Sequence, residues 1–165
     1  MIKAILACDD YGGISKNGTL PWPHNSTDLK WFKSNTFDQV VVMGSTTWED
    51  PHMPRPLPGR MNVLVTRRES EYFGSGAPHK VIYGDLNWAV PRLDTEHPGK
   101  DTWIIGGVNI IEQTLGVIEE FYLSRIPGAY ACDTFLPLKK IESLFEKTWS
   151  ENHDGIEFEI WKKRK

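Results

Sequence analysis

The sequence predicts an α/β protein with a mixed, mostly parallel central β-sheet, helices on both faces and an antiparallel C-terminal hairpin. Two observations predict this fold. Apolar, β-branched runs alternate with segments of helical spacing over the first two thirds of the chain, and the last runs follow one another without a helix between them. The sequence contains no internal repeat and no linker, so we expect residues 1–165 to form a single domain.

The first strand and the first helix are separated by a long loop. Residues 2–8 form an apolar run that two aspartates end, and glycine-containing turns follow it. We therefore expect a flexible segment that extends to the first helix. Ser26 or Thr27 is predicted to cap that helix, which places Asp28 in its first turn.

A strand-to-helix unit follows. Residues 39–43 are a β-branched run that ends at Gly44, and the hydroxyl residues 45–47 can cap a short helix. Prolines crowd residues 51–58 and predict irregular structure, after which residues 61–65 resume as a strand.

Beyond residue 80 the sequence first continues the alternation of strands and helices and then predicts strands alone. Asp85 is predicted to open a weak helix that Pro91 shortens or kinks, and a second helix over 108–115 is stopped by Gly116. The other runs predict strands at residues 81–83, 102–105, 120–126, 134–136 and 157–161.

Composition excludes several classes of function. With 165 residues, 39% of them hydrophobic, and a net charge of −3, the chain reads as an ordinary globular protein with no attraction to nucleic acid or membrane. The basic end at 162–165 is typical of a solvated terminus. Cys8 and Cys132 fit neither a disulfide framework nor a zinc pair, so we expect a reducing, cytoplasmic setting. No apolar run has the length of a signal peptide or membrane span.

The chain lacks the patterns of a self-sufficient catalyst. No serine lies in a Gly-x-Ser-x-Gly motif, and all five histidines fall in expected loops or turns. Metal-ligand spacing is missing as well, so we expect no metal. We then expect an organic cofactor to provide the reactive group, while the protein binds and orients the reactants and stabilises charge.

Asp28 is the most informative acid. Trp31 and Phe32 follow it by three and four residues, which places all three side chains on one helix face. Burial along this apolar wall raises the pKa of the carboxyl, whereas the helix N-terminus lowers it. An ordinary acid in a capping turn is the alternative.

Three strand ends look suited to phosphate. Residues 44–47 and 106–109 each combine glycine with a helix start, where unpaired N–H groups attract anions. Thr66, Arg67 and Arg68 could hold a phosphate monoester through hydroxyl and guanidinium donors. A solvated turn is the alternative for that last segment.

These motifs together resemble dihydrofolate reductase, and the resemblance covers nearly the whole chain. It is carried, in order, by Ile5 and Ala7 and by residues 20–22, 28–33, 43–49, 55–62, 104–107 and 133–134. The resemblance implies the dihydrofolate-reductase-like fold and the reduction of 7,8-dihydrofolate to 5,6,7,8-tetrahydrofolate. In this reaction NADPH delivers a hydride to pterin carbon 6, and nitrogen 5 gains a proton. It also implies binding of antifolate-type molecules and a monomer.

The resemblance implies roles for residues on the substrate side. Asp28 would bind the amidine edge of the pterin and favour its protonation, with Ser124 linked to both, while Trp22 and Leu20 close over the site. Arg60 would pair with the α-carboxylate of the glutamate tail. The pterin and aminobenzoyl groups would be walled by Ile5, Ala7, Leu29, Phe32, Met53 and Leu57, with Ile105 at the nicotinamide end.

The resemblance also implies the NADPH site. Its residues would be Ala7, Ile14, Asn17, Gly18, Gly44, Ser45, Thr46, Thr47, Val65, Thr66, Arg67, Arg68, Ile105, Gly106, Gly107, Val108, Asn109, Ile110 and Thr134. The family has a cis peptide at the Gly106–Gly107 position, and Asp133 would brace the mobile loop through its backbone. Ser45 and Asn109 stand where relatives often carry basic groups, so phosphate binding is expected to depend more on the segment 66–68.

Two other functions fit part of the pattern. A pyrimidine reductase of riboflavin synthesis shares the fold and the cofactor, but it does not need the Asp28 helix face together with Arg60. A protein that binds pterins without reducing them would keep much of the same pocket. The intact Gly106–Gly107 junction argues against this second alternative.

Overall fold

The computed structural model describes residues 1–68 and 76–165, which contain a sheet of eight strands and a small sheet of two. In chain order the strands are β1 (Ile2–Cys8), β2 (Gly13–Ser15), β3 (Val40–Gly44), β4 (Met61–Val65), β5 (Lys80–Ile82), β6 (Thr102–Gly106), β7 (Glu120–Arg125), β8 (Thr134–Phe135), β9 (Phe145–His153) and β10 (Ile156–Lys163).

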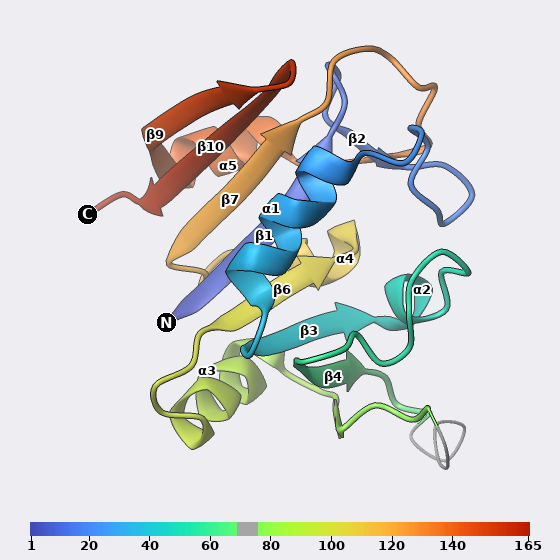
Figure 1. Ribbon diagram of the computed structural model, residues 1–165. Coiled ribbons are helices and arrows are strands. Elements are labelled where there is room, and N and C mark those ends of the chain that lie inside the picture. Colours follow the sequence, from blue (N-terminus) through green and yellow to red (C-terminus); the bar gives the residue numbers. More distant parts are fainter. Residues whose placement is uncertain (69–75) are drawn as a thin grey trace.

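The large sheet has the order β5–β4–β3–β6–β1–β7–β10–β9 (Figure 1). All pairings from β5 to β7 are parallel, whereas β10 is antiparallel to both β7 and β9. The predicted mixed, mostly parallel sheet with a C-terminal antiparallel hairpin is therefore confirmed.

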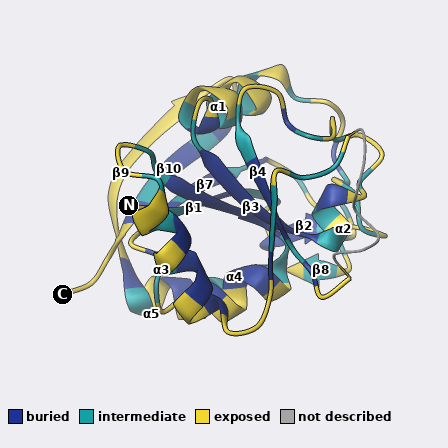
Figure 2. Ribbon diagram, turned by 90° about the horizontal axis from the view of Figure 1, so that it is seen from below, coloured by how far each residue is buried: buried dark blue, intermediate teal, exposed yellow. Residues whose placement is uncertain are grey.

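Helices cover both faces of this sheet, as predicted. They are α1 (Ser26–Thr36), α2 (Ser45–Trp48), α3 (Leu86–Glu96), α4 (Val108–Thr114) and α5 (Leu138–Leu144). Figure 2 shows α1 on one side of the strands and α3, α4 and α5 on the other. The sheet is thus the middle of three layers.

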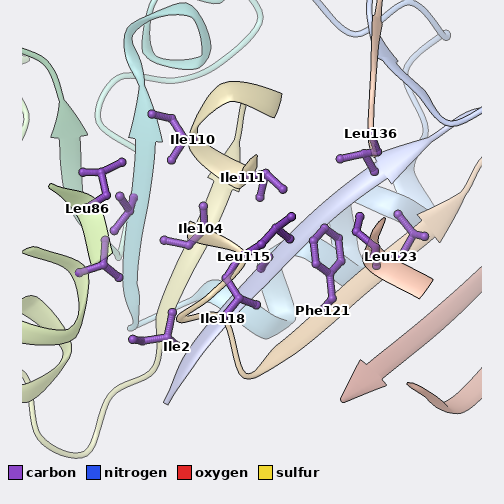
Figure 3. Packing of buried hydrophobic residues seen from close by; sticks show 14 of the residues in the cluster. Ile2, Leu86, Ile104, Ile110, Ile111, Leu115, Ile118, Phe121, Leu123 and Leu136 are labelled. Atoms are coloured by element: carbon purple, nitrogen blue, oxygen red, sulfur yellow. The ribbon is translucent and has the colours of Figure 1, made fainter. Parts of the chain in front are cut away.

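The two faces of the sheet build two hydrophobic clusters from alternate residues. Ala4 and Ile104 belong to the larger cluster, which packs against α3 and α4 (Figure 3). Their neighbours Ile5 and Ile105 belong to a smaller cluster that meets α1 through Phe32. Because successive strand side chains point to opposite faces and both faces are covered, the strands read as continuous apolar runs.

The segment between β1 and α1 is more ordered than the sequence predicts. β2 pairs with β8, with Gly13 opposite Phe135 and Ser15 opposite Thr134, so the irregular part begins only after Ser15. A Cβ at Gly13 would lie 2.5 Å from the Cys132 sulfur, which explains why a glycine is needed at this contact.

The C-terminal part contains two elements that the sequence analysis missed. α5 contradicts the expectation that the last strands follow one another without helices, and β9 precedes β10 as a long edge strand. Only Phe145 of β9 is buried. An edge strand whose residues are nearly all exposed has no hydrophobic alternation that could reveal it.

Two helix boundaries also differ from expectation. Asn25, rather than Ser26 or Thr27, caps α1, because its side-chain oxygen accepts a 3.1 Å hydrogen bond from the Asp28 N–H. Pro91 does not shorten α3, which continues to Glu96. Burial of Leu93 beyond the proline outweighs the one backbone hydrogen bond that proline removes.

Candidate active site

Asp28 faces the sheet from the first turn of α1. Its carboxylate is hydrogen-bonded to Ser124, a buried residue of β7. Burial raises the pKa of the Asp28 carboxyl above its ordinary value, and the bond to Ser124 offsets part of this rise. The direction of the rise is the one that the sequence analysis expects from burial.

Strands β1 and β7 lie beneath this carboxylate. Ala7 is the register partner of Ser124, and Ile5 is the partner of Tyr122 two residues away. The spacing of two residues puts Ile5 and Ala7 on the same face of the sheet as α1. The sheet thus offers a small side chain at the position nearest Ser124.

Most of the predicted apolar wall gathers in one place. Ile5, Leu57 and Ile105 are buried in the smaller cluster, and Phe32 and Met53 pack against it. Leu29 differs, because 42% of it is exposed and it does not join the cluster.

Asn62 was missed by the sequence analysis, although it organises the substrate side. It is fully buried on β4, its Oδ1 accepts from the Leu57 N–H at 2.8 Å, and its Nδ2 donates to the Leu57 and Arg60 carbonyls at 3.0 Å. An asparagine inside a strand of apolar residues was the available signal, because a buried amide needs partners.

Arg60 lies at the end of the chain segment that Asn62 holds. Its Nε donates to the Pro58 carbonyl at 2.9 Å and its Nη1 to the Thr36 hydroxyl at 3.2 Å. The guanidinium carbon lies 5.8 Å from the Phe32 ring centre. Burial lowers the pKa of the Arg60 guanidinium from its ordinary value.

Trp22 and Leu20 have different surroundings. Trp22 is 7% exposed and clusters with Ile126 and Phe158, and Tyr130 meets its ring edge-on with centroids 6.0 Å apart. Leu20 is 51% exposed. In the loop between β2 and α1, the Trp22 side chain is therefore held by packing, whereas the Leu20 side chain is exposed to solvent.

The loop that carries Leu20 is tied down at two points. The Asn17 N–H donates to the Asp133 carboxylate at 2.8 Å, which is the brace that the resemblance implied. A Cβ added at Gly18 would lie 3.3 Å from the Thr46 methyl group, so the loop tip touches the start of α2.

Strands β3 and β6 end side by side, and each leads directly into a helix. Met43 is opposite Gly106, and the peptide bond from Gly106 to Gly107 is cis, as the resemblance implied. Gly44 and Gly107 are the N-cap residues of α2 and α4, and neither helix has a side-chain cap. Uncapped backbone N–H groups at adjacent helix starts can hold a diphosphate.

The rest of the predicted cofactor side surrounds these two helix starts. Gly44 approaches Ile110, since a Cβ there would lie 3.2 Å from the Ile110 Cγ1, and Val65 at the end of β4 is the partner of Gly44. Asn109 is exposed and accepts from Gln113 at 3.0 Å. Ile14 of β2 belongs to the larger core cluster, which also contains Ile110. Ser45, Thr47 and Val108 are half-buried and Thr46 is exposed at the helix starts, while Thr134 is half-buried on β8.

The loop after β4 presents hydroxyl and basic groups. Thr66 is buried, its N–H donates to the Ile82 carbonyl, and its hydroxyl accepts from the Arg68 N–H at 3.1 Å. Arg67 and Arg68 are exposed. Thr66 therefore fixes the backbone from which both arginines extend.

Asp9 is the second residue that sequence analysis missed. Only 1% of it is exposed, and its carboxylate accepts four hydrogen bonds from groups in two separate loops. The signal was an aspartate directly before a glycine-containing turn, where the side chain commonly accepts from the backbone two residues on.

Over residues 1–68 and 76–165, no group of three or more histidine, cysteine, aspartate or glutamate side chains could hold a metal ion. In the same part of the chain, none of the helices has the length and apolar character needed to cross a membrane.

Comparison with known proteins identifies the family. The family model for dihydrofolate reductase matches residues 1–161. The chain belongs to the dihydrofolate reductase family. The predicted activity, reduction of dihydrofolate with NADPH, is thereby confirmed.

Individual relatives agree with this assignment. A dihydrofolate reductase type 8 of Escherichia coli is 30% identical over 164 residues, covering 99% of this chain and 96% of that protein. A putative bifunctional dihydrofolate reductase-thymidylate synthase of Oryza sativa subsp. japonica is 42% identical over 138 residues, covering 76% of this chain. The match spans 28% of the rice protein's length.

A solved structure confirms the fold. The dihydrofolate reductase from Enterococcus faecalis, complexed with NADP(H) and RAB-propyl, superimposes with a TM-score of 0.79 and 26% identity. The alignment covers 100% of this chain and 97% of the other.

Proposed function

We propose that Asp28 is the residue on which catalysis of dihydrofolate reduction depends, assisted by Ser124, Trp22 and Leu20. The observation that carries this proposal is the half-buried Asp28 carboxylate in the first turn of α1, whose pKa is raised by burial and whose hydrogen-bond partner is Ser124. A carboxylate with few donors can accept hydrogen bonds from the amidine edge of a pterin. Its negative charge there favours the protonated ring.

The proton and the hydride have separate sources in this proposal. NADPH, when bound, supplies the hydride that pterin carbon 6 receives. The proton that nitrogen 5 gains would come from a water molecule. Asp28 raises the affinity of the ring for this proton, and Ser124 holds the carboxylate in place. Trp22 and Leu20 exclude bulk water from the reacting ring, which strengthens the electrostatic effect of Asp28.

The substrate would lie along the smaller cluster. Leu29 would cover the open side of the aminobenzoyl group from its exposed position on α1. Arg60 would bind the α-carboxylate of the glutamate tail with the N–H groups that its contacts to Pro58 and Thr36 leave available. The apolar residues proposed to bind substrate are Ile5, Ala7, Leu29, Phe32, Met53, Leu57 and Ile105.

The chemistry of the donor set fits NADPH. Uncapped N–H groups at the starts of α2 and α4 suit the diphosphate, while the Thr66 hydroxyl with Arg67 and Arg68 suits the ribose phosphate. Ala7 and Ile105 would contact the nicotinamide. We propose the same set that the resemblance implies, from Ile14 on β2 and Asn17 and Gly18 in the loop after it to Thr134 on β8.

The remaining features of the molecule are part of the same proposal. Residues 1–165 form one dihydrofolate reductase domain, and the protein acts as a monomer in the cytoplasm. Its partners are dihydrofolate and antifolate-type molecules. Neither a riboflavin-pathway reductase nor a non-catalytic pterin-binding protein is supported, because the matching family model and the relatives described above are dihydrofolate reductases.

A nicotinamide oxidation assay tests the activity directly. Purified protein with dihydrofolate should consume NADPH much faster than NADH, and no consumption should occur without dihydrofolate. Absence of any dihydrofolate-dependent oxidation would contradict the proposal. The Asp28→Asn variant in the same assay tests whether the activity depends on this residue.

A further inference from the structure

The buried carboxylate of Asp9 connects two loops that are far apart in the sequence. Its Oδ1 accepts from the N–H groups of Tyr11 and Gly13, both at 2.9 Å. Its Oδ2 accepts from the Tyr130 N–H at 3.1 Å and from the Cys132 thiol at 3.5 Å. Each oxygen therefore serves one loop: the turn after β1, or the connection between β7 and β8.

The neighbouring Asp10 makes a useful comparison, because it joins the same two loops from the surface. Its Oδ2 accepts from the Gly128 N–H at 3.0 Å, and the residue is exposed. Asp9 is 1% exposed and has four donors. A buried acceptor that loses its donors costs far more free energy than an exposed one. Backbone hydrogen bonds also join the two loops, but of these two carboxylates Asp9 contributes more to their relative placement.

One of the four donors leads to the active site. Tyr130 donates its N–H to Asp9, and its ring meets the Trp22 ring edge-on at an interplanar angle of 69°. Trp22 is otherwise enclosed by Ile126, Ile156 and Phe158. Tyr130 is thus a contact through which the position of the β7–β8 connection reaches the Trp22 ring, and unlike Ile126, which also lies in that connection, it is bound directly to Asp9.

We propose that Asp9 is a positioning residue for hydride transfer, which acts by fixing Tyr130 and, through its ring, Trp22. This inference rests on the proposed role of Trp22 in covering the reacting pterin. Asp9 touches neither substrate nor cofactor in this account. It determines how Trp22 is held.

The carboxylate form is needed at this position. Burial alone would raise the pKa of Asp9, but the hydrogen bonds from Gly13, Tyr130, Tyr11 and Cys132 outweigh it and lower the pKa below its ordinary value. An asparagine has only one acceptor atom. In either orientation of its amide, two of the four donors would face an NH₂ group.

The experiment measures single-turnover hydride transfer with NADPH and with its deuterated form. A deuterium isotope effect on the rate shows that the hydride-transfer step itself is observed. Titration with a tight-binding antifolate gives the concentration of folded sites, by which the measured rate is divided. Asp9→Asn should lower this rate roughly ten- to hundredfold, as expected for misplacement of a group at the reacting centre. Asp10→Asn removes the same charge and should keep the parental rate.

Repeating the Asp9→Asn measurement in the Trp22→Phe variant tests whether Asp9 acts through Trp22. If Asp9 acts through Trp22, the Asp9→Asn effect should shrink to less than about twofold in Trp22→Phe, because the two residues are coupled. Equal losses in both backgrounds, or no loss from Asp9→Asn, would overturn the inference. If Trp22→Phe alone keeps the parental rate, the proposed role of Trp22 fails as well, which separates the two failures.

A second pair of variants keeps the test decisive if Asp9→Asn folds poorly. Tyr130→Leu retains the N–H that binds Asp9 but removes the ring edge against Trp22, and it should reproduce the rate loss. Tyr130→Phe keeps the ring and loses only the 3.2 Å bond from its hydroxyl to the Pro127 carbonyl, so it should match the parent. Identical rates for Tyr130→Leu and Tyr130→Phe would refute the route through Tyr130.

Discussion

The two sides of the candidate site are built in different ways. On the substrate side, Asp28 and Arg60 are partly or largely shielded from water, and each has side-chain or backbone partners and a pKa shifted by burial. On the cofactor side, the polar groups are backbone N–H groups at the starts of α2 and α4 and the exposed arginines Arg67 and Arg68. The charged groups are thus at least partly shielded from water on the substrate side, whereas those on the cofactor side are exposed to solvent.

This difference determines how each side responds to change. A charge in a shielded setting interacts strongly with the one partner that it faces, so its removal is expected to affect chemistry or binding sharply. Exposed charges are screened by salt and contribute in graded amounts. We therefore expect large, specific losses on the substrate side and smaller, salt-dependent losses on the cofactor side.

The largest expected effect is that of Asp28→Asn on turnover. The amide keeps the shape but removes the negative charge that favours protonation of the pterin, so turnover should fall about 10²–10⁴-fold, the range for loss of general acid–base assistance. Steady-state kinetics from acid to neutral pH should show partial rescue at low pH, where the substrate is already protonated. Near-parental turnover at neutral pH would rule out the proposed role, and Asp38→Asn, at an exposed acid just beyond α1, is the control.

The substrate side was also the more predictable of the two from sequence. Asp28 with Phe32 on one helix face follows from spacing alone, and the structure shields this carboxylate enough to raise its pKa, as expected from burial. Its link to Ser124 was expected only from the resemblance, because a serine on a distant strand has no local signal. The same holds for Asp9 and Asn62, whose importance comes from donors brought together by tertiary structure.

The fold was predictable where burial on both sheet faces creates apolar runs, as in β1, β3 and β6. It was not predictable where an element is exposed or very short. β9 has a single buried residue, and β2 has only three residues, of which Gly13 lies closely against Cys132. Pro91 differs in the other direction, because packing of α3 against the sheet continues the helix to Glu96 although proline favours a helix end.

Arg60→Leu should give the second-largest effect. Loss of a charge-assisted hydrogen bond to a carboxylate costs about 1.5–3 kcal/mol, so dihydrofolate should bind more weakly by roughly ten- to a hundredfold. A truncated pterin without the glutamate should bind both proteins equally, as measured by fluorescence titration. Equal losses for the two ligands would instead indicate that Arg60 supports the fold through Thr36 and Pro58.

Replacing Arg67 and Arg68 together by alanine tests the exposed side. NADPH differs from NADH by the ribose phosphate, so the double variant should lose NADPH affinity by about tenfold and leave NADH and dihydrofolate almost unchanged. The loss should shrink as salt is raised. Lys139 and Lys140 on α5 are exposed as well, and their double alanine variant is the charge-matched control. An unchanged preference for NADPH would place the phosphate site elsewhere.

The smallest expected effect links the shielded charge to stability. Because the pKa of Asp28 is raised in the folded protein above its ordinary value of 3.8, the folded state binds the proton more tightly than the unfolded state. The free energy of unfolding therefore falls as pH rises from below 3.8 through the folded pKa, and the full cost remains at neutral pH. Asp28→Asn removes this cost, so it should be more stable than the parent at neutral pH by about 0.5–1 kcal/mol.

Urea unfolding of both proteins at neutral pH and at pH below 3.8 measures this difference in the free energy of unfolding. The contributions of the other carboxylates cancel in the difference, because the two proteins share them. The gain should disappear at the lower pH, where Asp28 is protonated in both states. A variant that is less stable than the parent at neutral pH would mean that the bond to Ser124 outweighs the burial of the charge. A variant that is more stable and far less active would show that the shielded charge on the substrate side is kept for chemistry at the expense of stability.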